Sequence, residues 1–105
     1  MKTAGCTPVL KALGDETRWR IVQELLRVER AKVTELAERL KVTQPNMSKH
    51  LRILREAGIV ISQKDSTVVW CEVEPEFLKK VRGGDLGLDL GCCTFRFDRP
   101  LKSGE

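Results

Sequence analysis

Residues 34–71 read TELAERLKVTQPNMSKHLRILREAGIVISQKDSTVVWC and contain two short helical patterns followed by two strand patterns. In the first, residues 35–40, apolar residues recur at the helical period, and Thr34 precedes them as the predicted N-cap. The second begins after Thr43, its predicted N-cap, and ends at Gly58, a residue type that commonly closes a helix. Two short helices joined by a turn of about three residues predict a helix-turn-helix.

The second half of this stretch changes from a helical to an extended pattern. Residues 59–61 and 68–71 are rich in β-branched and aromatic side chains, and the polar residues 63–67 separate them. This pattern is typical of a β-hairpin with a polar tip. A hairpin directly after a helix-turn-helix predicts an α+β, mostly α fold, namely a winged helix-turn-helix whose wing is the hairpin.

Further elements are expected on both sides of this unit. A helix over residues 7–13 and a longer helix starting at Asp15 precede it, and Pro75 opens a last short helix that extends to Val81. Glycines then interrupt any regular pattern, and a short strand is expected around Phe95.

The chain has the length of a single domain. Its 105 residues, 41% hydrophobic and 32% charged, suit one hydrophobic core. We expect the winged helix-turn-helix over residues 1–82 and a glycine-rich C-terminal segment over residues 83–105. No apolar run approaches the roughly 20 residues that cross a bilayer, and the N-terminus lacks a signal-peptide pattern. These features predict a cytoplasmic protein with no membrane partner.

Positive charge is concentrated in the middle of the chain. The formal net charge is +4, and residues 41–64 carry five basic side chains against one acidic side chain, Glu56. A solvated helix face normally mixes both signs, so this excess favours a polyanionic partner.

The second helix of the predicted helix-turn-helix carries polar side chains suited to DNA. They are Gln44, Asn46, Ser48, Lys49, His50 and Arg52. Amides suit adenine edges, a serine hydroxyl suits a base or a phosphate, and the cations suit phosphates or guanine in the major groove. Lys64 near the hairpin tip suits the DNA backbone or an adjacent minor groove. The alternative is a protein-interaction module whose polar residues face water, but a neutral partner would not need the charge of residues 41–64.

Catalytic patterns are not indicated by the sequence. The single histidine lies in the predicted DNA-reading helix, and neither a serine–histidine–aspartate arrangement nor a glycine-rich phosphate loop after a strand is suggested. We therefore expect a protein that is not an enzyme and has no permanently bound cofactor.

Two segments, LKALGDETR over residues 10–18 and SKHLRILREAGIV over residues 48–60, resemble the ArsR/SmtB family of metalloregulatory repressors. The likeness extends over about residues 7–82. It implies a homodimer built through the first and last helices that binds an inverted-repeat operator in double-stranded DNA and releases it when an inducer binds. It also implies that Ser48 and His50 contact DNA.

Apolar residues of the first and last helices are candidates for that dimer interface. They are Val9, Leu10, Leu13, Phe77, Leu78 and Val81. Each of them would serve equally well in the core of a monomer.

The cysteines depart from the pattern of the family. Many members carry a Cys-x-Cys pair at the start of the helix before the turn, where residues 33–36 read VTEL, and others bind zinc through ligands of the last helix. Neither site is present in this sequence. The remaining candidates are Cys92 and Cys93, adjacent in the glycine-rich segment, with Cys6 as a third thiolate, because the resemblance places the first helix and the C-terminal segment together. Cys71 shares a strand face with valines and is expected in the core.

Three interpretations of these cysteines remain open. Soft thiolates favour arsenite or another thiophilic ion such as antimonite, cadmium, lead or copper(I), which would act as the inducer. Alternatively, peroxide oxidises one thiol, and a disulfide forms between Cys6 and either Cys92 or Cys93, since adjacent cysteines close only a strained ring. Otherwise the pair merely packs beside Phe95 and Phe97.

Overall fold

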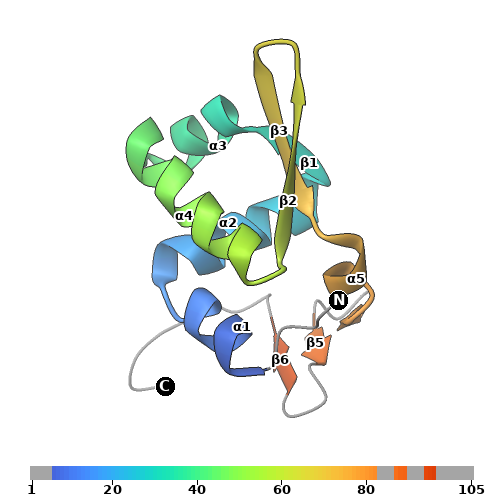
Figure 1. Ribbon diagram of the computed structural model, residues 1–105. Coiled ribbons are helices and arrows are strands. Elements are labelled where there is room, and N and C mark those ends of the chain that lie inside the picture. Colours follow the sequence, from blue (N-terminus) through green and yellow to red (C-terminus); the bar gives the residue numbers. More distant parts are fainter. Residues whose placement is uncertain (1–5, 83–86, 90–93, 97–105) are drawn as a thin grey trace.

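The computed structural model describes residues 6–82, 87–89 and 94–96 (Figure 1). Along the chain the elements are α1 (Cys6–Leu13), α2 (Glu16–Val28), β1 (Arg30–Lys32), α3 (Val33–Leu40), α4 (Gln44–Glu56), β2 (Val60–Asp65), β3 (Val68–Val73), α5 (Pro75–Leu78), β4 (Val81–Arg82), β5 (Gly87–Asp89) and β6 (Thr94–Arg96). Helices α3 and α4 form the predicted helix-turn-helix, and β2 and β3 form the wing. The predicted winged helix-turn-helix fold is therefore confirmed.

Side-chain caps fix the starts of the two longer helices. Asp15 is the N-cap of α2, and its carboxylate accepts a hydrogen bond from the backbone N–H of Arg18 at 3.1 Å. Thr43 caps α4 as predicted, because its Oγ1 accepts from the backbone N–H of Asn46 at 3.4 Å. These bonds satisfy backbone donors that a helix leaves unpaired at its first turn. At the other end of α4, Gly58 takes a φ of 79°, a conformation that glycine adopts without strain.

Two predicted boundaries were wrong, and one strand was not predicted. Helix α3 starts at Val33, so Thr34 lies inside it; Lys32 is the N-cap, and its N–H donates to Glu35 Oε1 at 3.1 Å. The last short helix ends at Leu78, and Val81 belongs to β4 instead. Strand β1 was not predicted, because three residues are too few to show a strand period.

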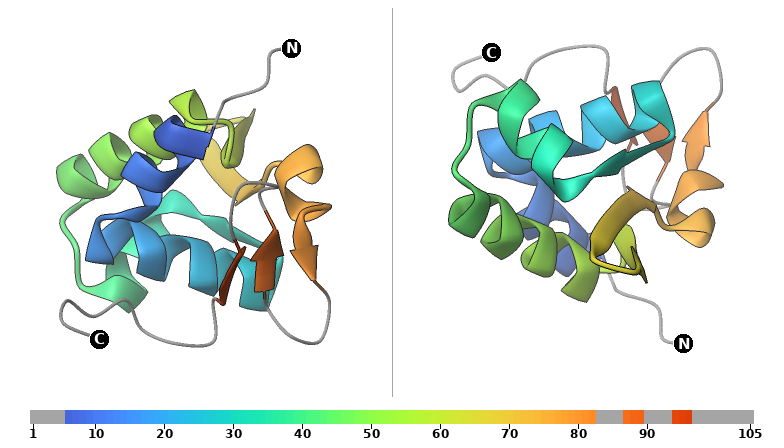
Figure 2. Two further views of the ribbon diagram at one scale, coloured as in Figure 1. Left: turned by 90° about the horizontal axis from the view of Figure 1, so that it is seen from below. Right: turned by 90° about the horizontal axis from the view of Figure 1, so that it is seen from above.

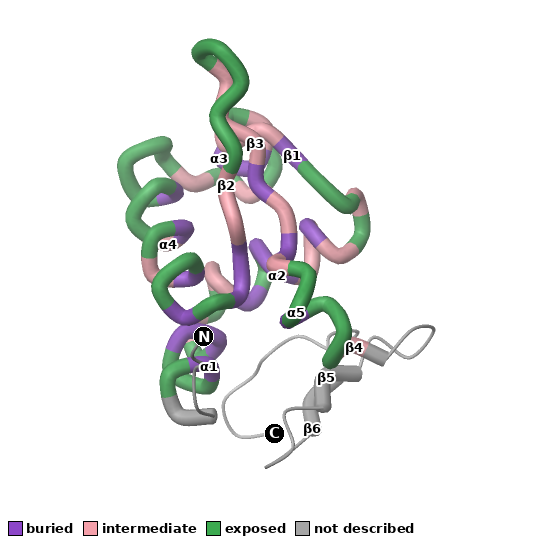
Figure 3. Tube along the Cα trace, turned by 45° about the vertical axis from the view of Figure 1, so that its right-hand side comes forward, coloured by how far each residue is buried: buried purple, intermediate pink, exposed green. Residues whose placement is uncertain are grey.

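The wing belongs to a three-stranded antiparallel sheet in the order β1-β3-β2. Cys71 of β3 lies opposite Ala31 of β1 and Ser62 of β2 in the register. The hairpin tip extends away from the helices and is exposed (Figures 1 and 3). A second sheet, β4-β5-β6, lies beside α5 at one side of the helical group (Figure 2).

One core holds the helices and the base of the wing together. Its largest fully buried side chains come from α2, α3, α4, the residue before β2 and the wing, and include Ile21, Leu25, Leu36, Met47, Leu51, Leu54, Ile59 and Val60. Burial of each such side chain stabilises the fold by about 1.5–3 kcal/mol. None of the helices in the described part of the chain is long and apolar enough to span a membrane.

The six apolar candidates for a dimer interface divide into two groups. Val9, Leu13 and Phe77 are buried within this single chain, so these three residues belong to the core of one protomer. Leu10 and Leu78 are 36% and 48% exposed, while Val81 packs partly against the core. The two exposed leucines remain available for contact with a second copy.

Candidate nucleic-acid interface

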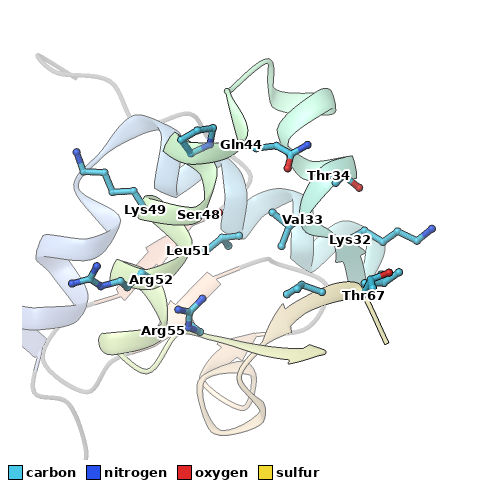
Figure 4. Close-up of a pocket in the computed structure, with 13 residues that line it drawn as sticks. Lys32, Val33, Thr34, Gln44, Ser48, Lys49, Leu51, Arg52, Arg55 and Thr67 are labelled. Carbon is cyan, nitrogen blue, oxygen red and sulfur yellow. The ribbon is translucent and has the colours of Figure 1, made fainter. Parts of the chain in front are cut away.

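A groove of about 790 Å³ lies between α4, the start of α3 and the wing (Figure 4). Its lining residues are Lys32, Val33, Thr34, Gln44, Pro45, Ser48, Lys49, Leu51, Arg52, Arg55, Thr67, Val68 and Val69. Four of these side chains are cationic and none is acidic. The groove therefore presents positive charge along its length, as a polyanion requires.

The buried face of α4 determines which of its side chains reach the groove. Met47, Leu51 and Leu54 are buried against the rest of the domain. Because residues four apart share one helix face, Gln44 and Ser48 lie one turn apart on an exposed side that borders the groove. The same geometry places Arg52 one turn further along (Figure 4).

A hydrogen bond joins the end of α4 to the wing. Arg55 Nη1 donates to Ser62 Oγ at 3.5 Å, and Ser62 Oγ lies 3.7 Å from the sulfur of Cys71. On the outer side of the sheet, two cations of β1 lie near the Trp70 ring, with Arg30 Cζ at 4.2 Å and Lys32 Nζ at 5.5 Å from its centroid. Such cation–π contacts restrain the orientation of Lys32 beside the groove.

The seven predicted DNA-contacting residues are distributed as follows. Four line the groove, namely Gln44, Ser48, Lys49 and Arg52. Asn46 is exposed on α4, and Lys64 is exposed on the wing opposite Val69 in the register.

His50 differs from the other six. It is half-buried, and its Nδ1 lies 3.2 Å from Arg18 Nη1 of α2. Its ring is therefore engaged with the body of the domain.

The groove also contains residues for which the sequence predicted no specific contact. Arg55 of the positively charged segment 41–64 is one of them, whereas Thr67 belongs, with Lys64, to the hairpin tip that was predicted to touch DNA. Lys32 and Thr34 enter the groove from the start of α3, next to β1. The pairing of β1 with β3 places Lys32 there, and no local signal in the sequence indicates that pairing.

The thiols are only partly described by the structure. Cys71 is fully buried, as predicted, and burial raises the pKa of its thiol, while the hydrogen bond to Ser62 and the charge of Arg55 oppose that shift. Cys6 opens α1, and Cys92 and Cys93 lie outside the described residues. Within the part of the chain that the structure describes, no three histidine, cysteine or acidic side chains are grouped so that they could hold a metal ion. The site predicted from Cys6, Cys92 and Cys93 stays a prediction.

Comparisons with known proteins agree with this geometry. Residues 15–62 match the family model described as bacterial regulatory protein, arsR family. Over 65% of its length, the chain is 38% identical to the arsenic resistance transcriptional regulator ArsR1 of Pseudomonas putida. The matched region spans about half (53%) of that protein. It is 32% identical to the arsenical resistance operon repressor of Bacillus subtilis over 90% of this chain and 81% of that protein.

A solved structure shows the same fold. HlyU from Vibrio cholerae matches with a TM-score of 0.62 and 34% sequence identity, over 65% of this chain and 73% of that chain.

Proposed function

Because the chain belongs to the arsR family of bacterial regulatory proteins, we propose that it is a transcriptional repressor whose groove between α4 and the wing binds double-stranded operator DNA. The observation that carries this proposal is the groove itself, which combines four cations with exposed hydrogen-bonding side chains at the start of α4. An α-helix fits the major groove of B-DNA, so α4 is the recognition helix.

The groove residues divide into two roles. Gln44 and Ser48 lie where base edges would be reached from the first two turns of the recognition helix, and Asn46 is exposed beside them. Lys49 and Arg52 neutralise phosphates on its flank, and Lys64 on the wing contacts the neighbouring DNA backbone.

We infer that the repressor acts as a homodimer. An inverted repeat requires two recognition helices about one helical turn of DNA apart, which one chain alone does not supply. The exposed Leu10 and Leu78, on helices α1 and α5, offer apolar surface for the second copy.

We also propose that arsenite or another thiophilic ion is the inducer and that Cys92, Cys93 and Cys6 supply its thiolate ligands. The names of the two relatives above support a response to arsenic, and sulfur is the ligand that such ions prefer. Peroxide sensing through the same thiols is the competing mechanism.

Operator binding is tested by fluorescence anisotropy with a duplex from the promoter of the chain's own gene. Wild-type protein binds this duplex more tightly than a scrambled one, and the double variant Gln44→Ala/Ser48→Ala loses at least about tenfold in operator affinity. Gln63→Ala is the matched control, because Gln63 is an exposed glutamine of β2 that does not line the groove. Equal affinity of the double variant and the wild type would show that the recognition helix does not read this DNA.

A further inference from the structure

The single histidine of the chain, His50, lies on the recognition helix, and its ring makes a hydrogen bond with a side chain of α2. His50 Nδ1 lies 3.2 Å from Arg18 Nη1 and 3.9 Å from Asp15 Oδ2. The side chain of His50 is 20% exposed, so this polar contact is partly shielded from water. Arginine can only donate hydrogen bonds, so Nδ1 must be the acceptor in this pair. The observed contact therefore requires a neutral imidazole whose proton is on Nε2.

Arg18 connects three helices through one guanidinium group. Its Nε donates to the carbonyl oxygen of Ala12 near the end of α1 at 2.6 Å, while Nη1 reaches His50 of α4. Its own backbone N–H is held by Asp15 at the start of α2. Arg18 thus links the recognition helix to both α1 and α2.

We propose that Asp15, Arg18 and His50 form a proton-sensitive latch that positions the recognition helix, so that operator affinity falls when His50 is protonated. This inference rests on the proposed DNA-binding function. Arg18 and His50 act in it as positioning residues, since neither lines the groove.

The charges around His50 determine the direction of the effect. A proton on Nδ1 removes the acceptor for Arg18 and places a second positive charge beside the guanidinium. Asp15, with Oδ2 at 3.9 Å, is then the acceptor that His50 can turn toward. Lys11, the one charged side chain of α1, is exposed, and so are Lys49, the neighbour of His50 on α4, and Glu16, the neighbour of Asp15 on α2. Acid therefore exchanges the bond to Arg18 for one to Asp15 and shifts α4.

A direct contact between His50 and DNA would have the opposite pH dependence. A protonated imidazole that touched a phosphate would strengthen DNA binding as the pH falls, because it would add a positive charge to the interface. In the latch, the same proton weakens binding. The sign of the pH effect thus separates a positioning role from a contact role.

The test compares operator affinity at about pH 7.5 and at about pH 5.5. For each protein, the affinity for the operator is divided by its affinity for a scrambled duplex, which removes general effects of pH on charge. The ratio for the wild type falls by about fivefold or more on acidification, in the range of ordinary coupling between sites.

Two variants identify the latch. His50→Asn keeps an acceptor near the position of Nδ1 that does not titrate, so it retains wild-type specificity at the higher pH and loses less than about twofold at the lower pH. Arg18→Met removes the donor and gives a reduced ratio that no longer changes with pH. Arg20→Met, at an exposed arginine of the same helix, keeps the wild-type pH dependence. Thermal unfolding at both pH values checks that the variants are folded.

Two results would overturn the proposal: a ratio that rises on acidification, or a His50→Asn variant with the pH dependence of the wild type. A second measurement is independent of DNA. Long-range ¹H–¹⁵N spectra report the tautomer of the only histidine. The latch requires the Nε2–H form at the higher pH, and Arg18→Met should change this tautomer. A Nδ1–H form overturns the latch even if DNA binding is intact. Absence of operator binding together with the Nε2–H form overturns the proposed function and leaves the contact standing.

Discussion

Glu24 of α2 and Arg39 of α3 are joined by an ion pair, with 2.8 Å between Glu24 Oε2 and Arg39 Nη1. The same carboxylate oxygen lies 2.6 Å from Arg27 Nη2, one turn along α2. Glu24 thereby links the long helix of the body to the first helix of the helix-turn-helix. The hydrogen bond from Arg27, and after it the one from Arg39, lowers the pKa of Glu24, although desolvation opposes the shift.

Replacing Glu24 with glutamine should lower the free energy of unfolding at neutral pH by at most about 1 kcal/mol, because the pair is partly exposed and screened. The lowered pKa means that the ionised carboxylate stabilises the fold above its unfolded-state pKa, and that this contribution is lost as the pH falls through the folded-state pKa. Urea unfolding of wild type and Glu24→Gln should therefore differ at neutral pH and converge in acid. Glu38→Gln, at an exposed position of α3, is the control. A difference that does not change with pH would contradict the ion-pair explanation.

The buried thiol of Cys71 should be almost inert in the folded protein. Burial raises its pKa, and the thiolate is the reactive form, so iodoacetamide at about pH 8.5 should modify Cys71 only after urea is added. Since the folded-state pKa is raised, the stability that this group contributes is present at neutral pH and is lost as the pH rises through that pKa. Tandem mass spectrometry of the peptide that contains Cys71 measures the rate. Equal rates with and without urea would show that the thiol is accessible in the native state.

Phosphate contacts should appear in the salt dependence of DNA binding. Lys49→Ala and Arg52→Ala should each reduce the slope of log K against log salt by about 1, with scrambled and operator duplexes affected alike. Lys79→Ala is the matched control, because Lys79 is an exposed lysine next to α5 and does not line the groove. A slope that changes equally in the control would mean that only overall charge, and not the groove, governs binding.

Release from DNA should depend on the predicted thiols. Arsenite added to the reduced protein bound to a fluorescent operator should lower the anisotropy, and Cys92→Ser/Cys93→Ser should abolish this response while operator affinity is kept. Cys6→Ser should weaken the response if Cys6 is the third ligand, and Cys71→Ser should leave it unchanged. Release by peroxide alone would favour redox sensing instead. No release by either agent would make both inducer mechanisms wrong.

The sequence predicted the winged helix because each of its signals is local. Thr43, Gly58 and the apolar side of α4 mark one helix within a few residues, and the hairpin follows directly. Local signals do not predict the full lining of the groove, because Lys32 reaches it through the pairing of a three-residue strand with β3. The orientation of His50 was not predictable either, because its partner Arg18 lies 32 residues earlier and meets it only when α2 packs on α4.

The most direct test of the groove as the DNA site is a comparison of ¹H–¹⁵N spectra of the protein with and without its operator duplex. We predict that the backbone signals that change most belong to the start of α3, the first turns of α4 around Gln44 and Ser48, and the hairpin tip near Lys64. Arg30 and Trp70 on the outer side of the sheet should change little. The largest changes at Arg30 and Trp70, with α4 unaffected, would contradict the assignment of α4 as the recognition helix.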